Sequence, residues 1–151
     1  DLYYGVLLER CRIKESQCGL VLEQQGLWQR AQEVFSEAIT NEEEGALPNV
    51  PAREKEMWEV HWVEAAKRLN QWELLADYSK VNKLPQLYAE CAWKLGDWEG
   101  LQDTFANYAM PMDVPKIKIY QSFLALQNMK ISEVDSYCKQ AMNILVANWN
   151  I

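Results

Sequence analysis

The chain contains few residues of the types that perform catalysis or bind metals. His61 is its one histidine, and it lies in the stretch WEVHW at positions 58–62 with no nucleophile at a recognisable spacing. The cysteines include no C-x2-C pair, and they are Cys11, Cys18, Cys91 and Cys138. Protein zinc sites draw closely spaced Cys and His ligands from the chain. We therefore predict no metal site and expect His61 to have a packing or helix-surface role.

Motifs for nucleotide chemistry are also missing. The sequence has no G-x-G-x-x-G and no G-x-x-x-x-G-K-[ST], and it lacks the kinase set of Gly-rich loop, H-R-D and D-F-G. Carboxylates are spread evenly, so no acid–base pair stands out. The seven tryptophans could line a ligand groove, but their spacing favours core packing. We therefore predict no catalytic, cofactor-binding or metal-binding residues and no enzymatic activity.

Charge and hydropathy exclude further classes of function. The formal net charge is −7, and no run of Lys or Arg exceeds two residues. Nucleic acids and anionic lipids need clustered positive charge, so we expect neither as a direct partner. No apolar stretch approaches the roughly 20 residues that cross a bilayer. The first residues lack a signal-peptide layout, and we expect free, mostly buried thiols in a reducing compartment.

The apolar residues repeat with helical spacing almost everywhere. Trp58, Trp62, Ala65 and Leu69 form one continuous stripe of a helix, and no run alternates as a half-buried strand would. Nine helices are predicted, at about 2–12, 16–25, 28–42, 53–69, 71–82, 85–95, 97–109, 115–128 and 132–149. The helix at 115–128 has apolar residues on two faces, which predicts burial between neighbours. These faces hold Ile117, Tyr120 and Leu124, and Ile119, Phe123 and Leu126.

One long connection, at about 44–52, is rich in proline and glycine. Gly45 is expected to have freedom to adjust there. The acidic run at 42–44 that precedes it is unfavourable at the negative end of a helix dipole. The run could dock a basic partner, although a solvated helix end is the simpler interpretation.

Three sites share a pattern that indicates how the helices are connected. Gly26, Asn70 and Gly96 each stand two residues before a tryptophan. Both residue types tolerate the left-handed conformation that closes a helix, so each site predicts a tight helical hairpin. After the first, Ala31, Phe35 and Ala38, with Gly19 upstream, fit the second half of a tetratricopeptide repeat. The predicted fold is all-α, an irregular α-solenoid of stacked helical hairpins with tetratricopeptide-like repeats. An ordinary helical bundle is the alternative.

Four blocks of sequence together resemble a known family. LVLEQQGLWQRAQ at 20–32, MWEVHW at 57–62, LNQWELL at 69–75 and ECAWKLGDW at 90–98 resemble the FAT region of the TRRAP family. The blocks occur in the family's order, and the similarity runs from Leu2 to about Trp149. The chain also begins without methionine in helix-like sequence, which suggests a segment cut from a longer protein.

The resemblance implies a role that composition alone does not give. TRRAP-family proteins are very large nuclear pseudokinase scaffolds, related to phosphatidylinositol-3-kinase-like kinases, in SAGA-type histone acetyltransferase complexes. Residues 1–151 would then be part of a FAT-type helical repeat array that contacts adjacent repeats, the kinase-like domain and other subunits. A nuclear location follows, with no small-molecule substrate. The acidic balance argues against this segment receiving acidic activation domains.

Two alternatives remain open. The chain could be the FAT segment of an active phosphatidylinositol-3-kinase-like protein kinase, which would look much the same at these positions. It could also be a free-standing tetratricopeptide-type adaptor that grips a peptide in a concave groove. Such an adaptor should repeat Asn, Lys or Arg at groove positions, and no periodic set of this kind is found.

Overall fold

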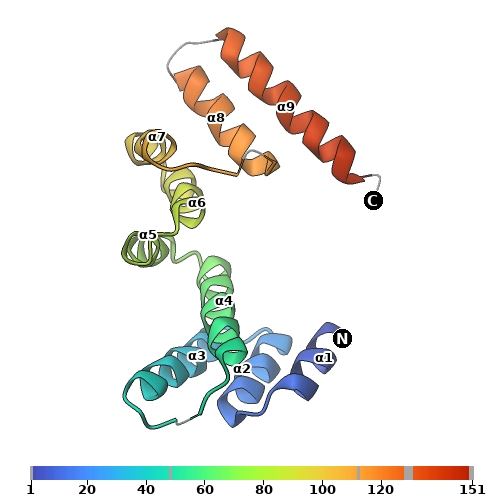
Figure 1. The fold of residues 1–151 in the computed structure, drawn as a ribbon, viewed down its shortest axis with the longest axis vertical. Coiled ribbons are helices and arrows are strands. Elements are labelled where there is room, and N and C mark those ends of the chain that lie inside the picture. Colours follow the sequence, from blue (N-terminus) through green and yellow to red (C-terminus); the bar gives the residue numbers. More distant parts are fainter. Residues whose placement is uncertain (1, 48, 112, 128–130, 150–151) are drawn as a thin grey trace. The chain divides into compact units, whose positions relative to one another are not determined.

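The fold consists of helices joined by short turns. The computed structural model describes residues 2–47, 49–111, 113–127 and 131–149. In these residues it contains no strand and has nine helices (Figure 1), which are α1 (Leu2–Arg10), α2 (Lys14–Gln24), α3 (Trp28–Glu43), α4 (Ala52–Arg68), α5 (Trp72–Val81), α6 (Pro85–Leu95), α7 (Trp98–Asn107), α8 (Pro115–Gln127) and α9 (Ile131–Trp149). The predicted all-α class is confirmed, and the observed helix ends differ from the predicted ones by at most two residues.

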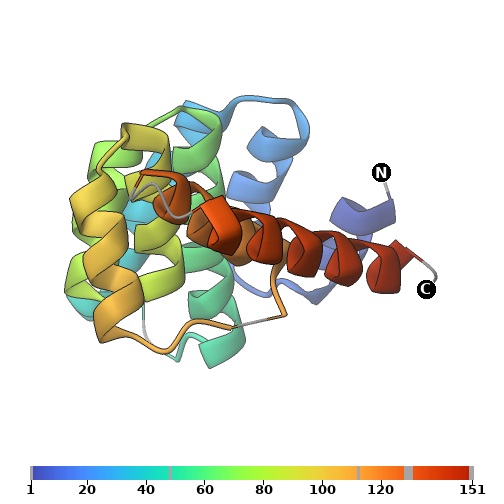
Figure 2. The same cartoon turned by 90° about the horizontal axis from the view of Figure 1, so that it is seen from above.

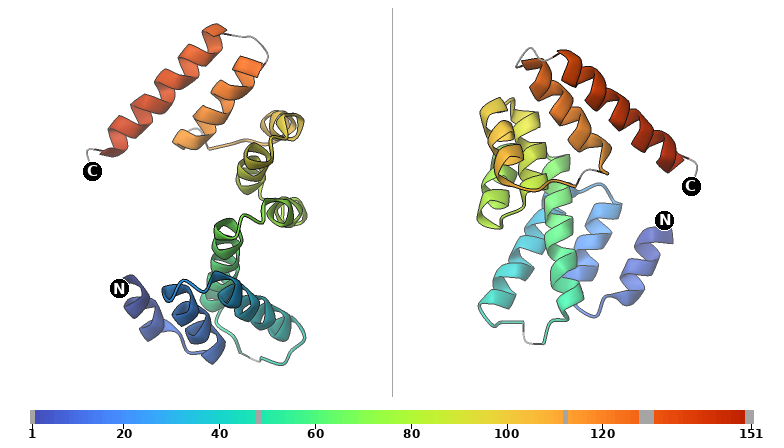
Figure 3. Two further views of the ribbon diagram at one scale, coloured as in Figure 1. Left: turned by 180° about the vertical axis from the view of Figure 1, so that it is seen from behind. Right: turned by 45° about the horizontal axis from the view of Figure 1, so that its top comes forward.

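The chain divides into two compact units, Asp1–Leu75 and Ala76–Ile151, with the division inside α5. In the first unit α1 packs on α2, α2 on α3 and α3 on α4; in the second, α6 packs on α7 and α8 on α9. Figures 1 and 3 show α8 and α9 side by side as a hairpin, and Figure 2 shows α9 along its length. Packing between consecutive helices is how helical repeat arrays are built.

The three predicted hairpin turns have the expected backbone conformation. Gly26, Asn70 and Gly96 have φ values of 77°, 57° and 72°, all in the left-handed region. In each turn the next residue's N–H bonds to a carbonyl five residues back, as in a Schellman motif. These bonds are Leu27 to Leu22 at 2.9 Å, Gln71 to Ala66 at 3.0 Å and Asp97 to Ala92 at 2.9 Å. A tryptophan then opens the following helix, as the sequence predicts.

A fourth turn of the same kind was not predicted. Lys83 has φ 54°, and the Leu84 N–H bonds to the Ser79 carbonyl at 2.9 Å, after which Pro85 opens α6. Asn70, Lys83 and Gly96 therefore close successive helices at intervals of 13 residues. Lysine does not signal a left-handed residue, so only Pro85 at the first helical position could have indicated this turn.

Gly45 contradicts the expectation of an adjustable loop residue. Its φ is 78°, and the N–H of Ala46 bonds to the Asn41 carbonyl at 2.8 Å. Gly45 therefore closes α3 with the same motif as the other turns. The sequence did not reveal this because the acidic run and the two prolines already account for a connection there.

Gly45→Val and Gly96→Val should consequently lower the unfolding free energy by similar amounts, about 1–2 kcal/mol each. A Cβ at either position would meet no atom within 4 Å, so backbone strain is the main cost. Urea denaturation of both variants measures it. Gly5→Ala is the control, because Gly5 lies in α1 without a positive φ and with equally open space. A loss confined to Gly96→Val would restore the interpretation of Gly45 as a free loop residue.

The core of the first unit lies between α2, α3 and α4. Ala31, Phe35 and Ala38 of α3 pack with Trp58 of α4, and all four are fully buried. A Cβ at Gly19 of α2 would overlap the Phe35 ring. Only glycine at this position lets α2 approach α3 this closely, which agrees with the place of Gly19 in the tetratricopeptide-like pattern.

The core of the second unit joins α6, α7 and α8. Ile117, Tyr120 and Leu124 of α8 pack with Ala89 of α6 and Leu101 of α7, so this predicted face of α8 is confirmed. Burial, and secondarily the charge of Glu90, raises the pKa of Tyr120 to about 12. Its hydroxyl stays neutral at physiological pH.

The second predicted face of α8 is partly wrong. Ile119 and Leu126 are 44% and 53% exposed, whereas Lys118 and Ser122 are buried. The Cys138 thiol of α9 lies 3.5 Å from the Ser122 hydroxyl, which identifies α9 as the helix covering this side. A small residue such as Ser122 permits close approach of α9, which the larger apolar residues on the neighbouring face would prevent.

Candidate functional site

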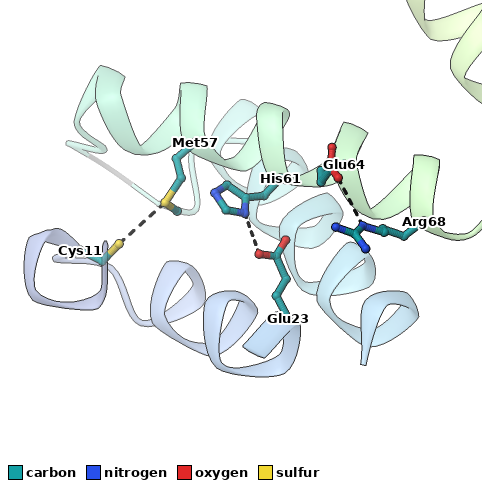
Figure 4. A network of polar contacts seen from close by, with 6 residues as sticks. All are labelled: Cys11, Glu23, Met57, His61, Glu64 and Arg68. Atoms are coloured by element: carbon teal, nitrogen blue, oxygen red, sulfur yellow. Dashed lines mark hydrogen bonds and ion pairs between the residues drawn. The ribbon is translucent and has the colours of Figure 1, made fainter. Parts of the chain in front are cut away.

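The single histidine lies inside the first unit and pairs with a carboxylate. His61 of α4 is 8% exposed and Glu23 of α2 is 3% exposed. The imidazole Nδ1 lies 2.7 Å from Glu23 Oε2 (Figure 4). In the tautomer that carries its hydrogen on Nδ1, the imidazole donates this hydrogen bond to the carboxylate. This contact joins α2 to α4 across 38 residues of sequence.

The surroundings of this pair are mainly apolar. The Phe35 ring centroid is 5.7 Å from that of His61, and Glu23 Oε1 is buried without a hydrogen-bond partner among the described residues. Nearby Tyr4 has its pKa raised, first by burial and then by the negative charge of Glu23. The contact with Glu23 engages the Nδ1 of His61, and the structure records no hydroxyl or thiol of a described residue in hydrogen-bond contact with this ring. The packing role predicted for His61 fits this arrangement.

A second buried carboxylate organises the start of α2. Glu54 is 2% exposed. Its Oε1 accepts from the Arg12 backbone N–H at 2.6 Å and its Oε2 from the Ser16 hydroxyl at 3.0 Å. The Ser16 oxygen in turn accepts from Trp58 Nε1 at 2.7 Å. Buried polar groups need such partners, and this chain of bonds fixes the turn between α1 and α2 against α4.

The cysteines are all free, but only half of them are buried. Cys11 and Cys91 are buried, whereas Cys18 and Cys138 are exposed, so the expectation of mostly buried thiols is wrong for two positions. Burial, and then the Glu54 charge, raises the pKa of the Cys11 thiol. Its Sγ lies 3.8 Å from Met57 Sδ (Figure 4). A protonated thiol in this setting is a poor nucleophile.

Neither a metal-binding cluster nor a membrane-spanning helix occurs in the described ranges. No group of three or more His, Cys, Asp or Glu residues there is placed to hold a metal ion. No described helix is both long and apolar enough to cross a membrane.

The tryptophans that open the helices lie at the edge of the core. Trp28, Trp72 and Trp98 are each half-buried, so the prediction of core packing holds only in part. The Arg68 guanidinium carbon sits 5.1 Å from the centroid of the Trp28 ring, and the Trp98 ring stacks on Phe123 at 4.6 Å. Each ring is therefore packed against part of the core and partly exposed to solvent.

The sequence of this chain matches a known domain family and several known proteins. Residues 85–150 match the FAT domain family. The chain is 31% identical to the SAGA complex/NuA4 acetyltransferase complex subunit TRA1 of Saccharomyces cerevisiae, over 99% of this chain and 4% of that protein. It is 32% identical to the probable transcription-associated protein 1 of Dictyostelium discoideum, over 99% of this chain and 3% of that protein.

The human relative is similar over the same extent. The transformation/transcription domain-associated protein of Homo sapiens is 28% identical over 99% of this chain and 4% of its own length. The chain thus spans only a few per cent of each of these relatives. The chain has a FAT-domain match in its second half and is similar to these proteins over nearly its whole length. It therefore belongs to the TRRAP family and corresponds to a segment of the family's proteins.

Proposed function

We propose that residues 1–151 are a non-catalytic scaffold segment of a TRRAP-like subunit in a SAGA-type histone acetyltransferase complex. The observation that carries the proposal is the similarity over 99% of the chain to a yeast protein named as a subunit of such complexes. The segment would form part of a FAT-type helical repeat array in a larger nuclear protein and act in transcription regulation.

The contacts of the buried polar side chains support a structural role. His61, Glu23 and Glu54 are buried and bonded to groups of neighbouring helices, which holds the helices in register. Apolar side chains on α1 and α9 are exposed, with Leu2 at 85% and Trp149 at 88%. In a repeat array each hairpin is covered by its neighbours. Adjacent repeats, the kinase-like domain and other subunits are therefore the proposed partners.

The other two candidates have less support. An active kinase of the same superfamily would share the FAT match at 85–150. The relatives compared above are instead named as an acetyltransferase complex subunit or as transcription-associated proteins. A free-standing adaptor does not account for the similarity to very long proteins, since the chain matches only a few per cent of their length.

Loss of helix packing should reduce assembly of the complex. In the full-length parent, replacing both Trp72 and Trp98 with alanine should lower recovery of acetyltransferase partners several-fold at matched expression, because local unfolding spreads to adjacent repeats. Each change should cost about 1–3 kcal/mol, less than a fully buried tryptophan, since both rings are half-buried. Affinity purification with quantitative mass spectrometry measures the recovery.

The exposed thiols supply the matched control. Cys18→Ser together with Cys138→Ser should leave partner recovery and promoter acetylation unchanged, because neither side chain is in the core. His61→Ala should act only to the extent that it lowers stability. Intact complexes with the tryptophan variants, or fully assembled complexes that lose acetylation with His61→Ala, would contradict the scaffold role.

A further inference from the structure

The second unit contains a cavity between the end of α5, the turn into α6 and the facing side of α7. Its volume is about 270 Å³. Its polar lining comes chiefly from Lys80, Lys83, Tyr88, Asp103, Asn107 and Tyr108. Leu84 and Pro85 add an apolar wall. The cavity is slightly smaller than those that hold drug-sized ligands, so its size suits one or two amino-acid side chains.

The positive charges at this cavity are not neutralised by ion pairs. Neither Lys80 nor Lys83 forms an ion pair with any described residue, although the chain as a whole carries a net charge of −7. Lys80 Nζ lies 5.2 Å from the centroid of the Tyr88 ring, which holds this ammonium group at the cavity wall. Asp103 contributes one opposing charge. The local balance therefore favours a single negative group.

Lys83 also occupies a backbone position that does not suit lysine. It has φ 54°, whereas the equivalent positions in the other four turns of this kind are Gly26, Gly45, Asn70 and Gly96. Glycine and asparagine adopt this conformation readily, and other residues are strained in it. The turn that departs from the pattern is thus the turn that lines the cavity. Strain of this kind often accompanies a functional requirement for the side chain.

We infer that the cavity is a docking site for a polypeptide segment that presents one carboxylate side chain next to an apolar residue. The inference rests on the proposed scaffold role and adds to it a place where a partner is held. Lys80 and Lys83 receive the carboxylate, while Asn107 and the two tyrosines offer further hydrogen-bond donors. Leu84 and Pro85 receive the apolar neighbour. Asp103 disfavours a compact polyanion, which distinguishes this site from a general anion site.

The test uses the purified 151-residue protein and two blocked peptides, acetyl-Leu-Glu-Leu-amide and acetyl-Leu-Gln-Leu-amide. Titrations followed by proton–nitrogen NMR give the dissociation constants and the amides that move. The Glu peptide should bind at least about fivefold more tightly than the Gln peptide, because its contact is charge-assisted. The shifted amides should lie between residues 79 and 108, and added salt should remove the preference.

Lys83→Gly separates a binding role from a structural one. Glycine relieves the left-handed strain, so the thermal midpoint should stay the same or rise while the preference for the Glu peptide falls to about onefold. Lys80→Gln should reduce the preference similarly. Lys94→Gln, at an exposed position outside the cavity lining, is the control and should leave it unchanged.

Three outcomes would overturn the inference. Equal binding of the two peptides would show that the cavity does not select a carboxylate. Sodium phosphate that moves the same amides at equal or lower concentration would show a site for free anions. A fall in thermal midpoint with Lys83→Gly, together with an unchanged peptide preference, would show a purely structural role. Lys83 would then act only by placing a positive charge near the carbonyl groups at the end of α5. None of these results bears on assembly of the complex, so the scaffold role is tested separately.

Discussion

Replacing Trp58 with alanine should lower the unfolding free energy of the first unit by about 3–5 kcal/mol, the largest effect expected from a single apolar truncation in this chain. Trp58 is fully buried among Ala31, Phe35 and Ala38. Its removal leaves a cavity. The helices α2 and α3 cannot move closer together to fill it, because they already meet at Gly19 and Phe35. The substitution also takes the Nε1 donor away from Ser16, which is 2.7 Å distant and itself bonded to buried Glu54.

Trp149→Ala is the matched control, because it makes the same chemical change at a side chain that is 88% exposed. It should alter stability by no more than about 0.5 kcal/mol. Trp58→Phe keeps most of the apolar volume but loses the Nε1 donor, so its cost should fall between the two. Urea denaturation followed by circular dichroism provides the comparison. Equal midpoints for Trp58→Ala and Trp149→Ala would show that Trp58 is not a core residue.

The sequence predicts the helices and three of the turns well because their determinants are local. Gly26, Asn70 and Gly96 adopt a conformation that their residue types favour, and the tryptophan two residues later marks the next helix. The contact between Gly19 and Phe35 could also be anticipated, since both positions belong to one recognisable helical-hairpin pattern.

The missed features depend on contacts between distant residues or on atypical residue types. Lys83 closes α5 although lysine gives no sign of a left-handed residue. The α9 helix covers buried Ser122 of α8, while Ile119 remains 44% exposed. Periodicity shows that a helix has several apolar faces, but the size and shape of the partner helix decide which face is covered.

The buried carboxylates illustrate the same limit. Glu23 and Glu54 look like surface residues in the sequence, because glutamate is rarely buried. Their partners, His61 of α4 and Ser16 of α2, lie 38 residues away in each case. No local spacing rule joins residues at that separation, so only the packed helices reveal that these side chains are internal.

Breaking the pair between Glu23 and His61 should destabilise the first unit far more than breaking an exposed pair. His61→Leu leaves both oxygens of a buried carboxyl group without a hydrogen-bond donor, because Oε1 already lacks one. The expected cost is about 3 kcal/mol, since an unpaired buried ionisable group loses its solvation without compensation. Glu23→Met should cost about 1–3 kcal/mol, because it leaves only the Nδ1 hydrogen of His61 unpaired.

Changing both residues together should recover most of this loss. The double variant Glu23→Met with His61→Leu removes both polar groups and keeps similar volumes beside Phe35, so it should lie within about 1 kcal/mol of the starting protein. Non-additivity of this size, measured by urea denaturation of the four proteins, is the signature of a direct contact.

Glu64→Gln provides the control from the same helix as His61. Glu64 and Arg68 form a contact of 3.4 Å with side chains about half exposed (Figure 4). Solvent screens such a pair, so the variant should change stability by less than about 0.5 kcal/mol. If the double variant at Glu23 and His61 is as unstable as the sum of the two single changes, the residues act independently. The buried bond between α2 and α4 would then not be the feature that holds His61 in place.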